Sequence, residues 1–452
     1  MGRRRHSAAA PSPPPSGLFG LHHSSARPGA VKPLLSYNLG ASGHFDPIGD
    51  KLGTVPNWIG GKGARMAGLG TYAVKADRFL LAGRGARGGY LFVSDGKFGA
   101  WQAERPDCEV VDFPGCWVAP GLVDTHIHGF AGTSTSDIDP AGLNAASVEL
   151  ARRGTTSWLP TTFTDSVERI GAACAAVLEA EDARGADFAG ARMPGIYLEG
   201  PFFTQKHVGA QNPAYLMDPS VEVFDEWQRR ARGRIVKSAL APERAGSGAY
   251  IAALRERGVV CCIGHSDASY EQALAGVDAG ATCFVHTYNG MRGLHHRDPG
   301  IVGCAMTTPG TYAEVICDGR HVAPAALDAL VRAKGWQHTV LITDCLGCGG
   351  MPEGEYLSGG LPVELRGGLC YLAGTDTIAG SVLTLVEGVR NVVDWGVATA
   401  EQALRMATEV PARSAGVDGV CGRILPGRAA DFIVLDAGLN LQRVYLAGIP
   451  LG

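Results

Sequence analysis

The chain has 452 residues, of which 46% are hydrophobic and 19% charged, and its formal net charge is −4. This length suits one barrel-sized domain with a smaller companion, and the composition is that of a folded globular protein. The weakly acidic balance argues against a nucleic-acid or membrane-surface partner, and no apolar run of about 18 residues offers a membrane span.

The first 66 residues differ in composition from the rest of the chain. They contain a Pro/Ser-rich stretch at 11–17, three consecutive arginines from Arg3 onward and few periodic apolar positions. This composition predicts a disordered, weakly basic extension over residues 1–66. No apolar segment follows the arginines, so a secretory signal is disfavoured. Met66 precedes the first strand-like pattern and is a candidate translation start.

Both ends of the remaining chain carry short strand patterns. Strand candidates within residues 67–118 lie at 79–81, 89–93, 97–101 and 110–113, and those within 419–452 lie at 431–436 and 441–446. Asp95-Gly96 is a hairpin signal between two of the first set. Because chain ends often lie close together, we expect the two regions to build one small β-sandwich domain.

Residues 119–418 alternate apolar strand candidates with helical segments. Strands are expected at 117–123, 156–160, 195–198, 259–263, 282–285, 313–316 and 339–342, and helices at 249–256, 270–279 and 324–333. Repeated βα units of this kind over roughly 300 residues predict an α/β fold with a (β/α)8 barrel.

The twelve cysteines are scattered, and several lie in apolar runs. We therefore expect reduced, buried thiols and a cytoplasmic protein rather than a disulfide framework. Cys345 and Cys348 form a Cys-x-x-Cys pair without the second pair that a structural zinc site needs. They are interpreted as small loop residues.

His126 and His128 follow the first barrel strand, two residues apart. Side chains i and i+2 of a strand point to the same side, so both imidazoles can reach one metal ion. Alone, the pair is a weak signal, because two histidines also simply fit a strand end.

Five further strand candidates are also followed by histidine or acidic residues. These residues are Glu199, His265, His286, Asp318 with His321, and Asp344. Barrel enzymes build their active sites at the carboxyl ends of the strands, so these side chains should meet at one rim. One such residue can be a satisfied core group, but six at equivalent positions indicate a shared site.

The residue types at this rim suit a divalent metal. Imidazole and carboxylate together favour zinc, with iron or manganese as alternatives. Glu199 is placed to bridge two ions. Asp344 can accept a proton from an activated water and return it to a leaving amine.

The combined motifs resemble the amidohydrolase superfamily. They are His126-x-His128, Leu-Glu-Gly-Pro at 198–201, Gly-His-Ser at 264–266, His-x-Tyr-Asn-x-Met at 286–291, Asp-Gly-x-His at 318–321 and Thr-Asp at 343–344. Within the superfamily they are most similar to the family of enzymes that deacetylate N-acetylglucosamine 6-phosphate. The resemblance covers about residues 72–450.

The resemblance implies a role for each matching residue. Glu199, His265 and His286 match metal ligands, His126 and His128 match the ligands of members with a second ion, and Asp344 matches the general base and acid. Asn289 and Gly290 match substrate contacts, and His321 matches a phosphate contact. Arg297 matches a phosphate-binding arginine from the neighbouring subunit of a homodimer. Gln211 departs from the pattern: some members carry a histidine there that binds the acetyl carbonyl. A glutamine can still donate a hydrogen bond to substrate, but it carries no charge.

The expected substrate is N-acetylglucosamine 6-phosphate, hydrolysed to glucosamine 6-phosphate and acetate with one or two metal ions per chain. The alternative substrate is N-acetylgalactosamine 6-phosphate, which differs in the orientation of one hydroxyl. A non-catalytic assembly protein would be expected to have lost ligands or Asp344, and all are present. A cyclic-amide hydrolase usually has a carboxylated lysine where Glu199 stands.

Overall fold

The computed structural model describes residues 70–452, and an eight-stranded parallel sheet forms the centre of this region. In spatial order from β14 through β13, β12, β11, β10, β9 and β8 to β5, neighbouring strands are hydrogen-bonded. The strands are β5 (Leu122–Ile127), β8 (Thr155–Thr162), β9 (Ile196–Phe202), β10 (Ile235–Leu240), β11 (Val260–Ile263), β12 (Cys283–Phe284), β13 (Tyr312–Ile316) and β14 (Thr339–Ile342). The predictions for residues 1–66, including a start at Met66, lie outside the described residues.

The first and last strands of this sheet meet and close it into a barrel. The backbone N–H of Asp344 donates to the carbonyl of His126 at 2.9 Å, and that of His128 donates to Cys345 at 2.9 Å. The Thr343 hydroxyl donates to the buried Asp124 carboxylate at 2.6 Å. The predicted (β/α)8 barrel is confirmed.

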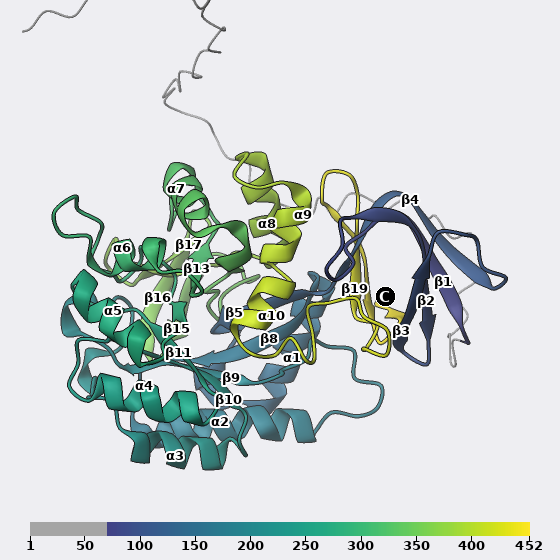
Figure 1. Cartoon of the computed structure of the whole chain (residues 1–452). Coiled ribbons are helices and arrows are strands. Elements are labelled where there is room, and N and C mark those ends of the chain that lie inside the picture. The colour runs from purple at the N-terminus through teal and green to yellow at the C-terminus, as the bar shows by residue number, and fades with distance from the viewer. Residues whose placement is uncertain (1–69) are drawn as a thin grey trace, which may run out of the picture. The chain divides into compact units, whose positions relative to one another are not determined.

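Helices surround the barrel (Figure 1). They are α1 (Pro140–Arg152), α2 (Val167–Asp182), α3 (Val221–Arg230), α4 (Ser247–Glu256), α5 (Tyr270–Ala279), α6 (Gly300–Thr307), α7 (Pro324–Lys334), α8 (Leu385–Asp394), α9 (Ala400–Met406) and α10 (Glu409–Ser414). Helices α4, α5 and α7 coincide with the predicted helical segments. None of the helices in residues 70–452 combines the length and apolar character that a membrane span needs.

A seven-stranded sheet joins the two ends of the described chain. Its strands, in spatial order, are β21 (Ile449–Pro450), β20 (Leu441–Leu446), β19 (Phe432–Leu435), β4 (Glu109–Pro120), β1 (Tyr72–Phe79), β2 (Arg87–Ser94) and β3 (Lys97–Gln102). Figure 1 shows the purple N-terminal and yellow C-terminal strands side by side. Asp95-Gly96 forms the predicted hairpin turn, with φ of 52° and 71°. The edge strand β3 also bonds to the segment before β19, because Phe98 N–H donates to Arg428 O at 2.9 Å.

A single residue, Gly121, separates β4 of the small sheet from β5 of the barrel. Its N–H donates to Asp431 O at 3.0 Å. A Cβ at this position would lie 1.9 Å from Oγ1 of Thr156, so no other residue fits without a shift. The single strand predicted over 117–123 is therefore wrong: the run belongs to two strands in different sheets.

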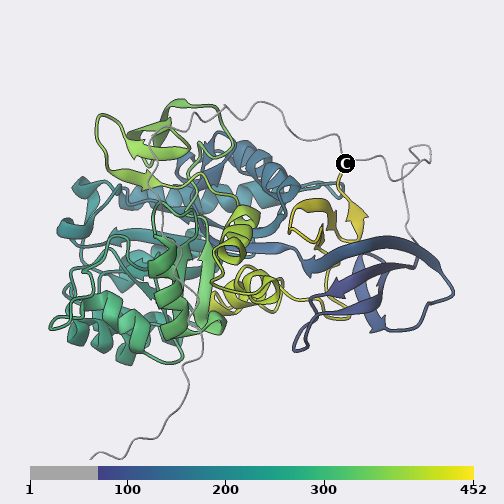
Figure 2. The same cartoon turned by 90° about the horizontal axis from the view of Figure 1, so that it is seen from above.

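Several elements of the fold were not predicted, including a barrel strand and a whole sheet. The first is β10, which supplies the barrel's eighth strand. The second is a four-stranded antiparallel sheet between β14 and α8, made of β15 (Gly354–Ser358), β16 (Leu361–Arg366), β17 (Leu369–Leu372) and β18 (Ile378–Gly380). Figure 2 shows this sheet in light green, away from the purple and yellow strands. Cys348 lies beside it, with its Sγ 3.5 Å from Sγ of Cys370 on β17.

Candidate active site

A cavity of about 230 Å³ lies at the carboxyl ends of the barrel strands. Its lining includes His128, Glu199, Gln211, His265, His286, Asn289, Gly290, His321 and Asp344, together with the segment 377–380. The structure therefore brings most of the predicted site residues to one rim. They do not come from successive strands, because β8 and β10 lie between contributing strands without supplying a ligand candidate.

Glu199, His265 and His286 form one group of possible metal ligands, with their ligand atoms within 4.8 Å of one another. Oε1 of Glu199 lies 3.3 Å from Nε2 of His265 and 3.1 Å from Nε2 of His286. All three side chains are buried. Glu199 lies within β9, and His265 and His286 lie two residues after the ends of β11 and β12.

His126, His128 and Asp344 form the second such group. Oδ1 of Asp344 lies 3.5 Å from Nε2 of His126 and 3.2 Å from Nε2 of His128. Glu199 stands between the two groups, because its Oε2 is also 3.0 Å from Nε2 of His128.

The hydrogen bonds around these histidines fit a bound cation. Nδ1 of His265 lies 2.8 Å from the His207 carbonyl, and Nδ1 of His286 lies 3.1 Å from the Asn289 carbonyl. A carbonyl only accepts, so both Nδ1 atoms donate and both Nε2 atoms carry lone pairs. These two Nε2 atoms face each other at 3.0 Å, an arrangement that a cation between them and Glu199 would stabilise.

The electrostatics of the second group point the same way. Burial opposes charge on His126, but the carboxylates of Glu199, Asp344 and Glu314 raise its pKa well above the ordinary value. Burial favours a neutral Asp344, yet the facing His126 and His128 hold its pKa below the ordinary value. The centre of the cluster therefore favours positive charge, and Asp344 is ionised at neutral pH.

Three of these residues have left-handed backbone conformations, which residues other than glycine rarely adopt. The φ angles are 45° at His265, 24° at His286 and 50° at Asp344. Such conformations persist where the surrounding structure enforces them, and they are frequent in active sites.

The remaining predicted residues divide into three arrangements. Asn289, Gly290 and His321 line the cavity, and Asp318 binds Nδ1 of His321 at 2.6 Å. Gln211 also lines it, but its Oε1 accepts from the Thr164 N–H and its Nε2 donates to Glu199, each at 2.6 Å. Gln211 therefore supports Glu199 directly, which leaves one N–H for the predicted substrate contact.

Arg297 is placed differently. It is exposed in the loop before α6 and is not among the described residues that line the cavity. Its Nη1 lies 2.7 Å from Nε2 of the neighbouring His296.

Sequence reasoning missed several residues at the site. Phe163 stacks on the His128 imidazole with ring centroids 3.7 Å apart. Glu314 and Lys237 form a buried ion pair behind His126. The available signal for this pair was a charged residue inside each of two apolar strands. The lining segment 377–380 carried no chemical signal.

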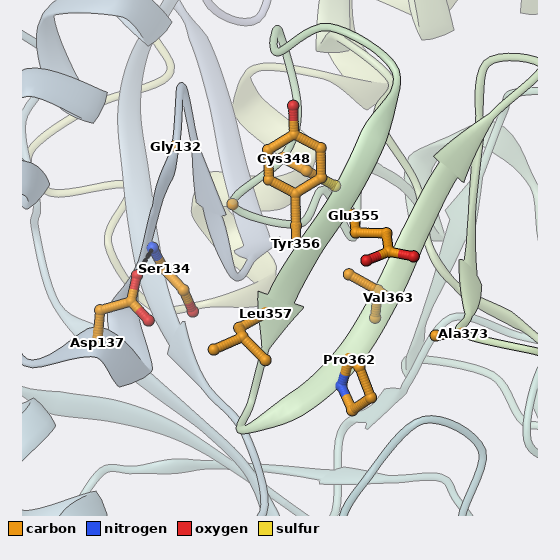
Figure 3. Close-up of a pocket in the computed structure, with 11 residues that line it drawn as sticks. Gly132, Ser134, Asp137, Cys348, Glu355, Tyr356, Leu357, Pro362, Val363 and Ala373 are labelled. Atoms are coloured by element: carbon orange, nitrogen blue, oxygen red, sulfur yellow. Dashed lines mark hydrogen bonds between the residues drawn. The ribbon is translucent and has the colours of Figure 1, made fainter.

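A second cavity, of about 620 Å³, lies between the strand pair β6 (Gly129–Phe130) and β7 (Thr133–Ser134) and the four-stranded sheet β15–β18. Figure 3 shows Ser134 and Asp137 on one side and Tyr356 and Leu357 on the other. It is larger than the first cavity, but none of its lining residues belongs to either ligand group. We therefore place the chemistry in the smaller one.

Comparison with known proteins gives consistent matches. The model of the Amidohydrolase family matches residues 117–449. The chain is 40% identical to an N-acetylglucosamine-6-phosphate deacetylase of Vibrio furnissii, over 73% of this chain and 81% of the relative. It is 37% identical to an N-acetylgalactosamine-6-phosphate deacetylase of Escherichia coli O157:H7, over 84% of this chain and 98% of the relative.

A solved structure is similar over the same region. It is a mutant of N-acetyl-D-glucosamine-6-phosphate deacetylase from Mycobacterium smegmatis in complex with N-acetyl-D-glucosamine-6-phosphate. The TM-score is 0.79 at 31% identity, covering 84% of this chain and 99% of that chain.

Proposed function

The chain belongs to the amidohydrolase family, and on that premise we propose that it hydrolyses the acetamide of N-acetylglucosamine 6-phosphate to glucosamine 6-phosphate and acetate. The observation that carries the proposal is that one cavity is lined by members of both ligand groups and by the phosphate-contact candidate His321. The members are Glu199, His265 and His286 of the first group and His128 and Asp344 of the second. The relatives' activities support the same reaction. Such a hydrolase acts on a linear amide C–N bond.

We propose that Glu199, His265 and His286 hold one divalent cation and that His126 and His128 hold a second, with zinc favoured by the ligand types. When bound, the metal lowers the pKa of water and polarises the amide carbonyl. Iron and manganese suit the same ligands less specifically.

Asp344 performs the proton transfers in this proposal. Its ionised carboxylate takes a proton from the attacking water and delivers it to the amide nitrogen, which leaves as an amine. Asn289 and Gly290 orient the sugar, and His321 binds the phosphate. The hydrogen bond from His321 Nδ1 to Asp318 leaves its Nε2 available for that contact. Gln211 holds Glu199 in place and reaches the acetyl group with its second N–H.

The function is tested by measuring acetate release from N-acetylglucosamine 6-phosphate and N-acetylgalactosamine 6-phosphate side by side. The galactosamine epimer is kept as the second candidate because the relative from Escherichia coli O157:H7 is matched over 98% of its length. A higher kcat/KM for N-acetylglucosamine 6-phosphate supports the proposal. A higher kcat/KM for N-acetylgalactosamine 6-phosphate would make that sugar the proposed substrate instead. Absence of acetate from both, with metal supplied, would refute it.

The assembly and compartment are also proposed. All twelve cysteines of the chain are free thiols, which supports a reducing, cytoplasmic environment. The exposed position of Arg297 outside its own cavity supports a homodimer in which this residue reaches the neighbouring site. The planar guanidinium pairs with two phosphate oxygens at once.

Arg297→Gln is expected to lower kcat/KM for the phosphorylated sugar by about 10- to 100-fold, because a hydrogen bond to a charged group contributes about 1.5–3 kcal/mol. Activity on unphosphorylated N-acetylglucosamine should not change. Arg232→Gln, at an exposed ion pair with Asp182, is the matched control. Equal loss on both sugars would contradict a phosphate role.

Mixing two impaired chains tests directly whether Arg297 acts in the active site of the neighbouring subunit. A hybrid dimer of Arg297→Gln and Asp344→Asn chains has one site with both an intact Asp344 and a partner arginine. Activity should therefore return on co-expression. No recovery in hybrids shown to form would place Arg297 in its own site instead.

A further inference from the structure

One of the four ligand histidines has a different partner behind it. Nδ1 of His128, His265 and His286 lies within 3.2 Å of a backbone carbonyl, from Thr161, His207 and Asn289 respectively. Nδ1 of His126 instead lies 3.0 Å from Oε2 of the Glu314 carboxylate. Among the four, only His126 is oriented by a charged side chain.

Glu314 lies wholly inside the barrel, on β13, with no exposed surface. Its Oε1 is paired with Nζ of Lys237 on β10, which is equally buried. Its Oε2 also accepts the backbone N–H of His286 at 3.4 Å, so one carboxylate contacts a histidine of each ligand group. Neither member of the pair lines the active-site cavity.

Lys237 also contacts an aromatic ring and a backbone carbonyl. Its Nζ lies 4.3 Å from the centre of the Tyr197 ring and 3.5 Å from the Thr125 carbonyl. Lys237 thus pairs with the carboxylate that contacts Nδ1 of His126.

A buried ion pair is a poor way to stabilise a barrel. Desolvation of both charges offsets most of their attraction, and apolar residues of similar volume usually serve stability as well or better. The geometry accounts for the pair in another way. An ionised carboxylate makes a stronger hydrogen bond to Nδ1–H than a neutral carbonyl does, and raises the basicity of Nε2.

We propose that Glu314 and Lys237 are positioning residues that set the cation affinity of the group containing His126, His128 and Asp344. Glu314 holds His126 in the tautomer with Nε2 facing the cluster, and Lys237 holds the Glu314 carboxylate in place through the buried ion pair. The inference deepens the proposed function and rests on its two-ion site. It is tested by metal binding alone, without substrate.

The experiment measures zinc affinity and stoichiometry by competition with a chromophoric chelator. Glu314→Gln should bind one of two ions about 10- to 100-fold more weakly, the usual effect of removing such a partner. The ion at Glu199, His265 and His286 should bind as in wild type. Asp318→Asn changes a carboxylate–histidine pair outside the ligand groups, so its zinc affinities should stay those of wild type.

A double variant separates this inference from the two-ion proposal. His126→Ala/His128→Ala should bind one ion fewer than wild type, and an unchanged stoichiometry would overturn the two-ion site itself. If that variant loses an ion while Glu314→Gln keeps both affinities, only the positioning role is overturned.

A second double variant distinguishes a folding defect from a loss of zinc affinity. Because Glu314→Gln leaves Lys237 unpaired, Lys237→Met/Glu314→Gln removes both charges together. This double variant should bind the same one of the two ions more weakly than wild type. A lower melting temperature with both zinc affinities unchanged would assign the pair to structure and overturn the inference.

Discussion

Asp344→Asn is expected to lower kcat by about 10²- to 10⁴-fold, the range that a positioned acid–base group contributes. Asparagine matches aspartate in size but cannot take a proton from water at neutral pH. The side chain of Asp344 is 13% exposed, whereas the His126 side chain facing it is 0% exposed, so the carboxylate borders the cavity.

The backbone at Asp344 should survive this substitution. Its N–H donates to the His126 carbonyl at 2.9 Å, and its carbonyl accepts from the Ser381 N–H at 2.9 Å. Neither bond uses the side chain, and asparagine tolerates the left-handed φ of 50°. Kinetics should thus show a lost kcat in a folded protein. Asp376→Asn, at a 99% exposed side chain, is the matched control. A kcat within tenfold of wild type would remove Asp344 from the proposed mechanism.

Glu199→Gln is expected to release both cations and to lower kcat/KM by about 10³-fold or more, since metal activation contributes several kcal/mol. Glu199 is the one ligand candidate that contacts histidines of both groups. Its Oε1 lies 3.1 Å from Nε2 of His286 in one group, and its Oε2 lies 3.0 Å from Nε2 of His128 in the other. Glutamine removes the negative charge and turns an N–H₂ group toward imidazole lone pairs.

The measurement is metal content per chain after gel filtration, together with acetate release. Glu364→Gln on the half-exposed surface of β16 should keep wild-type values for both. Restored activity at high zinc would indicate weakened binding of the same site. Retention of both ions at wild-type affinity would contradict the bridging position of Glu199.

The sequence predicted the rim better than the barrel interior. The ligand candidates could be found because each stands within or just after an apolar strand run, and strand ends meet in a barrel. Strand β10 was missed because Lys237 and Ser238 interrupt its apolar pattern. That interruption is half of the pair with Glu314, which stands in β13. Because β11 and β12 separate their strands in the sheet, these residues meet only across the closed interior, a contact that no periodicity reveals.

Gln211 shows a different limit of sequence reasoning. The resemblance predicted a glutamine facing the acetyl group, where some relatives have histidine. The structure engages its oxygen with Thr164 and one N–H with Glu199. A short polar side chain has several partners within reach, and only the folded backbone decides among them. The four-stranded sheet β15–β18 was missed for a simpler reason: its strands are short and carry no site chemistry.

The one-residue junction at Gly121 bears on how this protein can be divided. Domain boundaries normally fall in exposed linkers that few contacts cross. Here the chain leaves the small sheet and reaches His126 within five residues of Gly121, and that glycine is pinned to Asp431 near the other end of the chain. The small sheet is therefore no detachable accessory. A barrel excised from it would begin with an unanchored first strand, the one that carries two of the proposed ligands.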